Sequence, residues 1–459
     1  MKNDVLVTVY ITNYNYGKFI TQAVESVLNQ TLSDFEIIII DDGSTDNSRE
    51  IIETYANHAK IKVIYQKNKG LNVTNNIALR VAKGKYIMRL DADDFLDTNA
   101  LLVMSNMLEN DAELGLVFPN YYVTDASGNV DAVHQRHDFE KDVSLMDQAA
   151  HGACTMIRTE FLKELGGYNE NYQCQDGYEL WVKFTAKHRV ANVTTPLFYY
   201  RQHGSNLTKN ETRILTTRAT INQEYVRDEQ LRKHALAVIP IRDQGSTNHK
   251  LALTKMGEKT MLEYKIEAAI NSENTQQVVI TSPDDSIQDI IQEKYGNQPK
   301  LLFISRPKEQ AQLNVGLVET VSQALEHAPM QDIQVSSIVI LAIEYPFVSS
   351  STIDDAVNTM FLFQSDSLIS VRPDTSLFYQ HQGHGMKPIL NQEKFTKLER
   401  EALYKYTGGI SVTRVDVFRQ HKQFITGTVG HIVVDQKTSL GIFSDYDLQV
   451  ARLIAQSDL

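Results

Sequence analysis

The chain has few of the features that mark secreted, membrane-spanning or nucleic-acid-binding proteins. Its 459 residues include two cysteines, Cys154 and Cys174, which are too few for a disulfide framework. No apolar stretch approaches the roughly 20 residues that a membrane-spanning helix needs. After Met1 the sequence enters a strand-like run without the apolar core of a signal peptide. These absences favour a cytoplasmic protein without a transmembrane segment.

Positive charge is also scarce. The chain carries 45 Lys and Arg against 57 Asp and Glu, for a formal net charge of −12. A general nucleic-acid-binding protein would present a basic face, so nucleic acid is not an expected partner. A nucleotide remains a reasonable ligand, because one bound metal ion can reverse the local field.

Strand-like and helix-like segments alternate from the start of the chain. Apolar runs occur at residues 5–11, 35–40, 61–65 and 86–90, separated by helical patterns at 20–29, 46–58 and 73–82. This order is typical of a doubly wound α/β sheet. A hairpin is expected at 120–130, because its turn carries Asp, Ser and Gly. We therefore predict an α/β domain over residues 1–206.

A second α/β domain is expected in the remaining half. Residues 211–233 are polar and contain no Gly or Pro, which indicates a helical linker over 207–234. The strand-like run Ala235–Pro240 then restarts the alternation, and we assign residues 235–459 to the second domain. A chain of this length exceeds one ordinary core, so two domains are expected.

Carboxylates follow two of the buried strands of the first domain. They are Asp41, Asp42, Asp91, Asp93 and Asp94. In an open α/β sheet, ligands bind beyond the carboxyl ends of such strands. Converging carboxylates repel one another unless a positive species lies between them, and Mn²⁺ or Mg²⁺ prefers oxygen ligands and also carries phosphate. Asp-Gly-Ser is also ordinary turn chemistry, but two clusters at corresponding strand ends favour a ligand site.

The motifs in residues 5–206 resemble those of family 2 glycosyltransferases, which have the GT-A nucleotide-diphospho-sugar transferase fold. The similar segments are 11–15, 26–31, 40–46 and 90–94. The resemblance implies a nucleotide-sugar donor, with Asp93 of the Asp-x-Asp motif binding the metal. Together with neighbours in the two clusters, the expected donor contacts are Thr12, Tyr14, Asp41, Asp42, Asp91 and Ala92.

Three further positions bear on the chemistry that this resemblance implies. The segment 166–181 is similar to the one that holds the family's catalytic base, and Asp176 is the matching carboxylate. Many family members have Glu where this chain has Gln175, and the alternative role for Asp176 is that of a helix N-cap. His203 lies in a segment similar to the family's closing motif, where a histidine can reach the metal or the diphosphate, although a loop histidine can also be simply solvated. Many members carry Ala-Arg-Asn at 74–76, where this chain has Thr-Asn-Asn, so one nucleotide or phosphate contact is missing.

These residues predict an inverting, metal-dependent glycosyltransferase. Asp176 would take a proton from an acceptor hydroxyl while the metal stabilises the leaving diphosphate. UDP-sugars are the expected donors, ahead of GDP-, dTDP- and CMP-sugars. The acceptor could be a glycan, a lipid-linked sugar of a surface polysaccharide, or a protein.

The second half resembles the cytidylyltransferases that activate sialic acid, in the segments 237–242, 261–269, 353–356 and 442–448. Much of the phosphate-binding loop is changed, and only Arg242 and Lys250 remain as candidate anion-binding residues. Gly441 and Phe443 stand where that family has two aspartates for Mg²⁺, and Phe cannot ligate a hard cation. We therefore expect a catalytically inactive pseudoenzyme domain, through which the chain could form a homodimer.

Two alternatives remain open at this point. The chain could be a bifunctional enzyme that makes a CMP-activated nonulosonate and then transfers it. It could also be a nucleotide-sugar-binding scaffold without turnover, which the complete set of carboxylates in the first half opposes.

Overall fold

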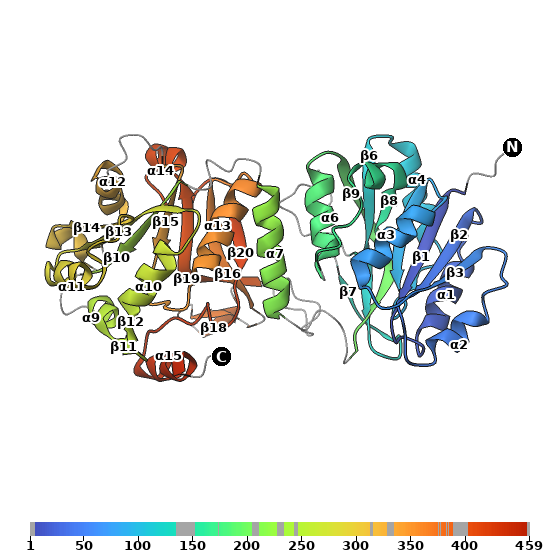
Figure 1. The fold of residues 1–459 in the computed structure, drawn as a ribbon, viewed down its shortest axis with the longest axis horizontal. Helices are drawn as coiled ribbons and strands as arrows, with labels where there is room; N and C mark the ends of the chain where they lie inside the picture. The colour runs from blue at the N-terminus through green and yellow to red at the C-terminus, as the bar shows by residue number, and fades with distance from the viewer. Residues whose placement is uncertain are drawn as a thin grey trace. The chain divides into compact units, whose positions relative to one another are not determined.

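A computed structural model gives the fold. It describes residues 5–134, 152–172, 174–203, 211–226, 234–242, 247–312, 315–327, 335–374, 376, 378–381, 383, 385–388 and 403–456. The contacts divide the chain into two compact units, Met1–Arg218 with Leu377–Arg400 and Ala219–Ser376 with Glu401–Leu459. Each unit contains a mixed α/β sheet (Figure 1), which confirms the predicted α/β fold class.

The first unit is built on a sheet whose main path has the order β3-β2-β1-β4-β8-β6-β9-β5, with β7 paired to β6. The strands are β1 (Val7–Asn13), β2 (Phe35–Asp41), β3 (Ile61–Tyr65), β4 (Tyr86–Asp91), β5 (Phe95–Leu96), β6 (Leu114–Thr124), β7 (Val130–His134), β8 (Met156–Arg158) and β9 (Arg189–Arg201). The four strands β3, β2, β1 and β4 are parallel. β8 runs antiparallel to β4 and to β6. The predicted hairpin is confirmed as the antiparallel pair β6 and β7.

Helices cover both faces of this sheet. They are α1 (Ile20–Leu28), α2 (Ser48–Glu53), α3 (Leu71–Val81), α4 (Ala100–Asn110), α5 (Thr159–Glu164) and α6 (Asp176–Thr185). Successive strand residues point to opposite faces, and the core divides accordingly. Val9 and Ile11 pack in one cluster with residues of α1 and α4, and Tyr10 packs in a second cluster with residues of α3, α5 and α6. Burial on both faces explains why these strands are almost continuously apolar.

The register brings the two acidic strand ends together. Asn13 of β1 lies opposite Asp41 of β2, and Thr12 of β1 lies opposite Asp91 of β4. Both clusters therefore flank the carboxyl end of β1. This is the edge at which α/β sheets of this kind bind their ligands.

The second unit contains a seven-stranded sheet of order β14-β13-β10-β15-β19-β16-β20. Its strands are β10 (Ala235–Pro240), β13 (Thr275–Ser282), β14 (Leu301–Ser305), β15 (Ser337–Leu341), β16 (Ser367–Asp374), β19 (Leu403–Arg414) and β20 (Val429–Val433). β14, β13, β10 and β15 are parallel, and β19 is antiparallel to β15. Two short hairpins pair β11 (Lys255–Met256) with β12 (Lys259–Thr260), and β17 (Tyr379–His381) with β18 (Met386–Pro388).

The helices in the second half are α7 (Glu211–Tyr225), which contains the boundary between the units, α9 (Thr247–Leu253), α10 (Met261–Ile270), α11 (Ser286–Tyr295), η2 (Lys308–Ala311), α12 (Val318–His327), α13 (Ser350–Leu362), α14 (Val415–His421) and α15 (Asp445–Gln456). α7 falls inside the predicted helical linker. α10 begins with a capping box between Thr260 and Glu263, which satisfies backbone donors that a helix start leaves open. Among the described residues, no helix is long and apolar enough to cross a membrane.

One lysine lies inside the core of the second unit. Lys265 of α10 is 0% exposed, and the described residues offer its Nζ no hydrogen-bond partner. Burial lowers the pKa of Lys265 to about 7, although the Glu344 carboxylate opposes this shift. The folded state therefore binds the lysine proton less tightly than the unfolded chain does.

Lys265→Met is expected to stabilise the second unit by about 1–3 kcal/mol near pH 7, since it removes a buried unsatisfied group. The unfolded lysine titrates near 10.5 and the folded one near 7. Wild-type stability should thus rise as the pH increases through this window, and the advantage of the variant should shrink. Calorimetric unfolding of the full chain between pH 6 and pH 10 measures both effects.

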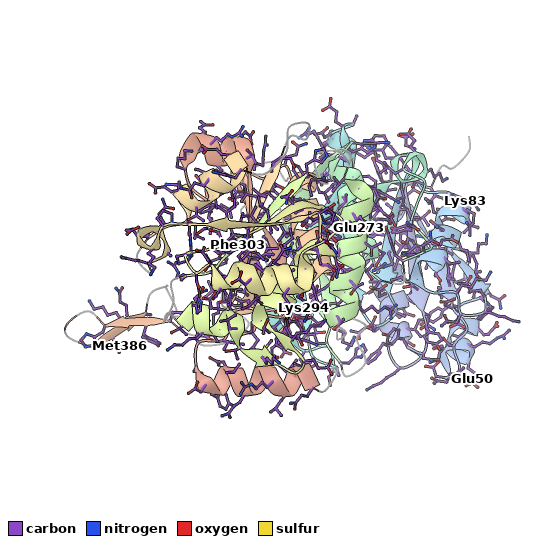
Figure 2. All side chains as sticks on the ribbon, turned by 60° about the vertical axis from the view of Figure 1, so that its left-hand side comes forward. Glu50, Lys83, Glu273, Lys294, Phe303 and Met386 are labelled. Atoms are coloured by element: carbon purple, nitrogen blue, oxygen red, sulfur yellow. The ribbon has the colours of Figure 1, made fainter. Side chains whose placement is uncertain are left out.

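A matched control is Lys294→Met. Lys294 (labelled in Figure 2) belongs to α11, is 48% exposed and pairs with Glu263 at 2.8 Å. Loss of this surface pair should change stability by less than about 1 kcal/mol. Equal destabilisation by both substitutions would contradict the assignment of Lys265 as a buried, unpaired amine.

Candidate functional site

The carboxyl end of β2 holds Asp41 in a network of short hydrogen bonds. Asp41 is 4% exposed. Its Oδ1 accepts from Asn13 Nδ2 at 2.8 Å and from Ser44 Oγ at 2.5 Å. Asn15 Oδ1 accepts from the backbone N of Thr45 at 2.7 Å, which joins the loop after β1 to the loop after β2. Hydrogen bonds therefore link the two loops at this edge of the sheet.

Asp42 has a different environment from its neighbour. Its Oδ1 accepts from Gln66 Nε2 at 2.7 Å and from Lys69 N at 2.9 Å, and its Oδ2 accepts from Gly70 N at 2.9 Å. Both carboxylate oxygens are thus engaged by the loop between β3 and α3. Asp42 shapes the wall of the site and does not point its oxygens towards an open space.

The end of β4 carries the next group of predicted residues. Thr12 Oγ1 donates to Asp91 Oδ1 at 2.9 Å, and Ala92 N donates to Thr12 O at 3.0 Å. Arg89 Nε lies 3.0 Å from Asp91 Oδ1. Tyr14, in the adjoining loop, is 46% exposed and is available to a ligand from solvent. The structure therefore brings Thr12 and Asp91 into direct contact, with Ala92 beside them.

Asp93 and Asp94 follow in the same turn and are both buried. His203 Nε2 lies 2.9 Å from Asp93 Oδ2, and Arg201 N donates to Asp94 Oδ1 at 2.8 Å. The His203 ring stacks on Phe19 with 5.4 Å between ring centroids. Burial and the Asp91 charge raise the pKa of Asp93, against the hydrogen bond to His203. Burial and the charges of Asp93 and Asp91 raise the pKa of Asp94 well above its usual range.

A divalent cation fits the chemistry of this cluster. Burial and mutual repulsion make the ionised form of Asp93 unfavourable, and a cation would relieve this strain. In the described ranges, no three His, Cys, Asp or Glu side chains are grouped to hold a metal. Asp93 and His203 would therefore supply the protein ligands, with substrate phosphates completing the shell, as is usual for Mg²⁺.

Asp176 is the first residue of α6 and is 8% exposed. The N-cap of this helix is Gln175, which has a left-handed backbone with φ of 63°, so the alternative role of Asp176 as the N-cap is not observed. The Oδ2 atom of Asp176 instead forms an ion pair and hydrogen bond with Arg89 Nη1. Gln175 Oε1 accepts from Arg218 Nη2 at 3.1 Å, and the Arg218 guanidinium lies 4.6 Å from the Tyr178 ring centroid. The bend before α6 thus aims Asp176 at the end of β4.

Asn75 occupies the position of the arginine that the resemblance led us to expect. It is 0% exposed, and Tyr10 Oη donates to its Oδ1 at 3.2 Å. Its Nδ2 has no hydrogen-bond partner among the described residues. Tyr10 also contacts Tyr168 Oη at 3.4 Å. The side chain at position 75 therefore belongs to a buried tyrosine network below the site.

Several residues at the site were not predicted. They are Asn13, Arg89 and Arg201. Arg89 is the clearest omission, because an arginine inside an otherwise apolar buried strand needs a partner of opposite charge, and that was a signal in the sequence. Arg201 Nε donates to Asp93 O at 2.7 Å, and its position at the end of the long strand β9 follows only from the tertiary fold.

The corresponding strand ends of the second unit are occupied by the chain's own groups. Arg242 N donates to Asn248 Oδ1 at 2.9 Å, and Asn248 Nδ2 donates to Glu344 Oε1 at 2.7 Å. Arg242 Nη1 also donates to Gln312 O. Lys250 is exposed on α9. The described contacts therefore engage Arg242 within the chain and leave Lys250 at the surface.

Gly441 and Phe443, the positions where metal carboxylates were predicted to be lost, pack against Tyr345. The rings of Tyr345 and Phe443 meet edge to face, 5.8 Å apart. A Cβ added at Gly441 would lie 2.5 Å from Phe443 Cε2 and 2.9 Å from Tyr345 Cε1. Two aromatic rings therefore fill the space beside Gly441, where a longer side chain would collide.

Comparison with known proteins confirms both resemblances. Residues 8–173 match the family model of glycosyl transferase family 2, and residues 236–406 match that of cytidylyltransferase. Chondroitin synthase of Escherichia coli is 34% identical over 213 residues, covering 45% of this chain and 30% of the relative. Hyaluronan synthase of Pasteurella multocida is 29% identical over 204 residues, covering 44% of this chain and 21% of the relative. The matches thus span less than a third of these relatives.

Similarity to solved structures is more distant. TarS 1–349 of Staphylococcus aureus aligns with a TM-score of 0.41 and 20% identity, covering 49% of this chain and 66% of that one. A mannosyltransferase of Pyrobaculum calidifontis, solved with GDP-Man and Mn²⁺, aligns with a TM-score of 0.38 and 18% identity, covering 48% and 64%.

Asp42→Asn should lower the unfolding free energy of the first unit more than Asp41→Asn does. The carboxylate of Asp42 accepts from two backbone N–H groups on different oxygens, and an amide has only one oxygen acceptor. The first unit should lose about 1–3 kcal/mol of unfolding free energy. Denaturant unfolding measures the loss, and slower exchange of the 66–70 amides in the variant than in wild type would contradict the assignment.

Proposed function

We propose that this protein is an inverting, metal-dependent glycosyltransferase that moves a sugar from a nucleotide-sugar donor to an acceptor hydroxyl. The observation that carries this proposal is the convergence of Asp91, Asp93 and Asp176 near the carboxyl end of the parallel strand β4. Arg89 contacts both Asp91 and Asp176, and His203 contacts Asp93. The match of residues 8–173 to the family 2 glycosyl transferase model supports the same reaction class.

Each end of the site has its own task. Asp41 and Asp91, with Thr12 and Tyr14, would hold the nucleoside of the donor. Asp93 and His203 would hold Mn²⁺ or Mg²⁺, which stabilises negative charge on the departing diphosphate when it is bound. Burial and the Asp91 charge raise the pKa of Asp93. A cation bound beside Asp93 would stabilise its ionised carboxylate, which supports this position for the metal.

Asp176 is the proposed general base. Its carboxylate would accept the proton of the acceptor hydroxyl, whose oxygen then attacks the anomeric carbon from the face opposite the diphosphate. The C–O bond to the diphosphate breaks as the new glycosidic bond forms, so one displacement inverts the anomeric centre. Burial of Asp176 at 8% exposure limits competition from bulk water.

The proposal also names the chemical classes of the donor and the acceptor. We propose a UDP-sugar as donor and a surface glycan, a lipid-linked sugar or a protein as acceptor. The relatives named chondroitin synthase and hyaluronan synthase favour polysaccharide biosynthesis. We propose that the protein acts in the cytoplasm, since its two cysteines, Cys154 and Cys174, are free.

For the second domain, residues 235–459, we propose a pseudoenzyme role in docking or homodimerisation. Phe443 and Gly441 supply no metal ligand, and Tyr345 packs against both. The match of residues 236–406 to the cytidylyltransferase model keeps a bifunctional enzyme as the second candidate.

Asp176→Asn should leave donor affinity within about threefold of wild type and reduce turnover by roughly 10²- to 10⁴-fold, the usual contribution of a general base. A panel of UDP-, GDP-, dTDP- and CMP-sugars with Mn²⁺, with and without EDTA, identifies the donor by calorimetry and by nucleotide release. Asp111→Asn is the matched control, since Asp111 pairs with Arg189 at 2.8 Å outside the site. Normal turnover by Asp176→Asn would remove Asp176 from the role of base.

The second domain should release no pyrophosphate from CTP and a nonulosonate in the presence of Mg²⁺, because it lacks the metal carboxylates. A coupled pyrophosphate assay on the full chain measures this. Sustained release that Arg242→Ala abolishes would replace the pseudoenzyme proposal with the bifunctional one.

A further inference from the structure

We propose that Arg89 is a positioning residue for the transfer reaction, which fixes the Asp176 carboxylate relative to Asp91 on the donor side. The proposal rests on the proposed function, because it assigns Asp176 as base and Asp91 as a donor contact. It adds a residue that neither the motifs nor the family match assigns. Its basis is one buried guanidinium shared between two carboxylates.

Arg89 reaches this position from the middle of β4. Its neighbours Met88 and Leu90 pack in the cluster with α1 and α4, so the Arg89 side chain points to the opposite face of the sheet. It lies opposite Tyr10 of β1 in the register. That face is covered by α3 and α6, and α6 begins at Asp176. Strand β4 and helix α6 thus place the Arg89 guanidinium and the Asp176 carboxylate in contact.

The contacts form a bridge. Arg89 Nη1 binds Asp176 Oδ2. On the other side, Nε lies 3.0 Å from Asp91 Oδ1 and Nη2 lies 3.4 Å from Asp91 Oδ2. Within the described residues Nε has no aligned hydrogen-bond acceptor, so its contact with Asp91 is ionic. Arg89 is 5% exposed, and its interactions are therefore weakly screened.

The guanidinium keeps its charge in this setting. Burial lowers the pKa of Arg89, but the Asp176 and Asp91 carboxylates raise it, and the net direction is upward. The bridge therefore carries a permanent positive charge between two negative groups. Without it, no described positive charge would lie between the Asp176 and Asp91 carboxylates, and their repulsion would be unfavourable.

The surroundings leave the guanidinium little freedom to move. A Cβ added at Gly152 would lie 2.6 Å from Arg89 Nη2 and 3.1 Å from Asp176 Oδ2. The backbone O of Arg89 accepts from Cys154 N at 2.7 Å. The chain at 152–154 thus packs against the bridge, and a side chain at position 152 would press on Arg89 Nη2.

The arrangement predicts a split between turnover and binding. Asp91 keeps its hydrogen bond from Thr12 when Arg89 is removed, so the donor side retains a fixed partner. Asp176 loses its only described ion pair. Misplacement of a reacting group by about 1 Å can cost on the order of 100-fold in rate, so the loss should fall on kcat.

The test compares Arg89→Met with wild type, using the nucleotide-sugar that wild type turns over in the panel. We expect kcat to fall by about 10- to 100-fold, while the donor Kd measured with Mn²⁺ changes by less than about threefold. In the Asp176→Asn background, Arg89→Met should cause no further loss, because both changes remove the same positioned carboxylate. A full additional loss in that background would show that Arg89 does not act through Asp176 and would overturn the proposal.

Two milder variants keep the test decisive if Arg89→Met does not fold. Arg89→Lys preserves the charge but loses the planar fork, and Gly152→Ala preserves every charge but crowds Nη2. Both should lower kcat with donor Kd unchanged, and neither should add to Asp176→Asn. A loss of donor affinity with unchanged kcat in these variants would instead make Arg89 a donor-binding residue.

The matched control is Arg158→Met. Arg158 is similarly buried at 6% exposure, and it donates to backbone oxygens outside the site, from Nε to Leu114 O at 2.7 Å and from Nη2 to Asp111 O at 2.9 Å. It should reduce thermal stability without the kcat-specific effect. If wild type turns over the donor and Asp176→Asn does not, a wild-type kcat in Arg89→Met would contradict only the role proposed for Arg89. If wild type releases no nucleotide from any donor, the proposed function itself is wrong.

Discussion

The structure of the first domain depends on how several carboxylates can lie close together near the carboxyl ends of its parallel strands. Asp41, Asp93, Asp94 and Asp176 are each less than 10% exposed, and like charges at such burial repel strongly. Asp41 accepts hydrogen bonds from neutral donors, and Asp94 accepts one from the backbone N of Arg201. Arg89 forms ion pairs with Asp91 and Asp176. Asp93 contacts His203, and burial and the Asp91 charge raise the pKa of Asp93. We therefore propose that a cation bound at Asp93 supplies positive charge to this cluster.

The second domain repeats this order of parallel strands with different groups at the strand ends. Its central parallel strands β13, β10 and β15 correspond in order to β2, β1 and β4. At their ends, Asp284 pairs with His249 at 2.7 Å. Glu344 accepts from Asn248, and its charge favours the protonated form of buried Lys265. The rings of Tyr345 and Phe443 meet edge to face beside Gly441. The two halves therefore share an order of parallel strands but carry different polar groups at the strand ends.

The sequence was most informative where apolar runs and turn residues agree. β10 begins and ends at the predicted residues, and both acidic strand ends were identified. The strands β8, β9 and β19 were not predicted, because β8 has three residues and the other two are rich in polar residues, which pairing with neighbours stabilises. Helix α2 ends at Glu53, before the predicted 58, since 54–57 form turns. Arg89 was missed because its partner Asp176 is 87 residues away in the chain.

The most direct test of the account is the position of a manganese ion in a crystal of the protein grown with Mn²⁺ and the nucleotide of its donor. Anomalous scattering locates the ion independently of the surrounding model. We predict one manganese ion at Asp93 and His203, with the nucleoside against Asp41 and Asp91. A nucleotide bound at this edge without manganese at Asp93, or manganese held elsewhere, would contradict it.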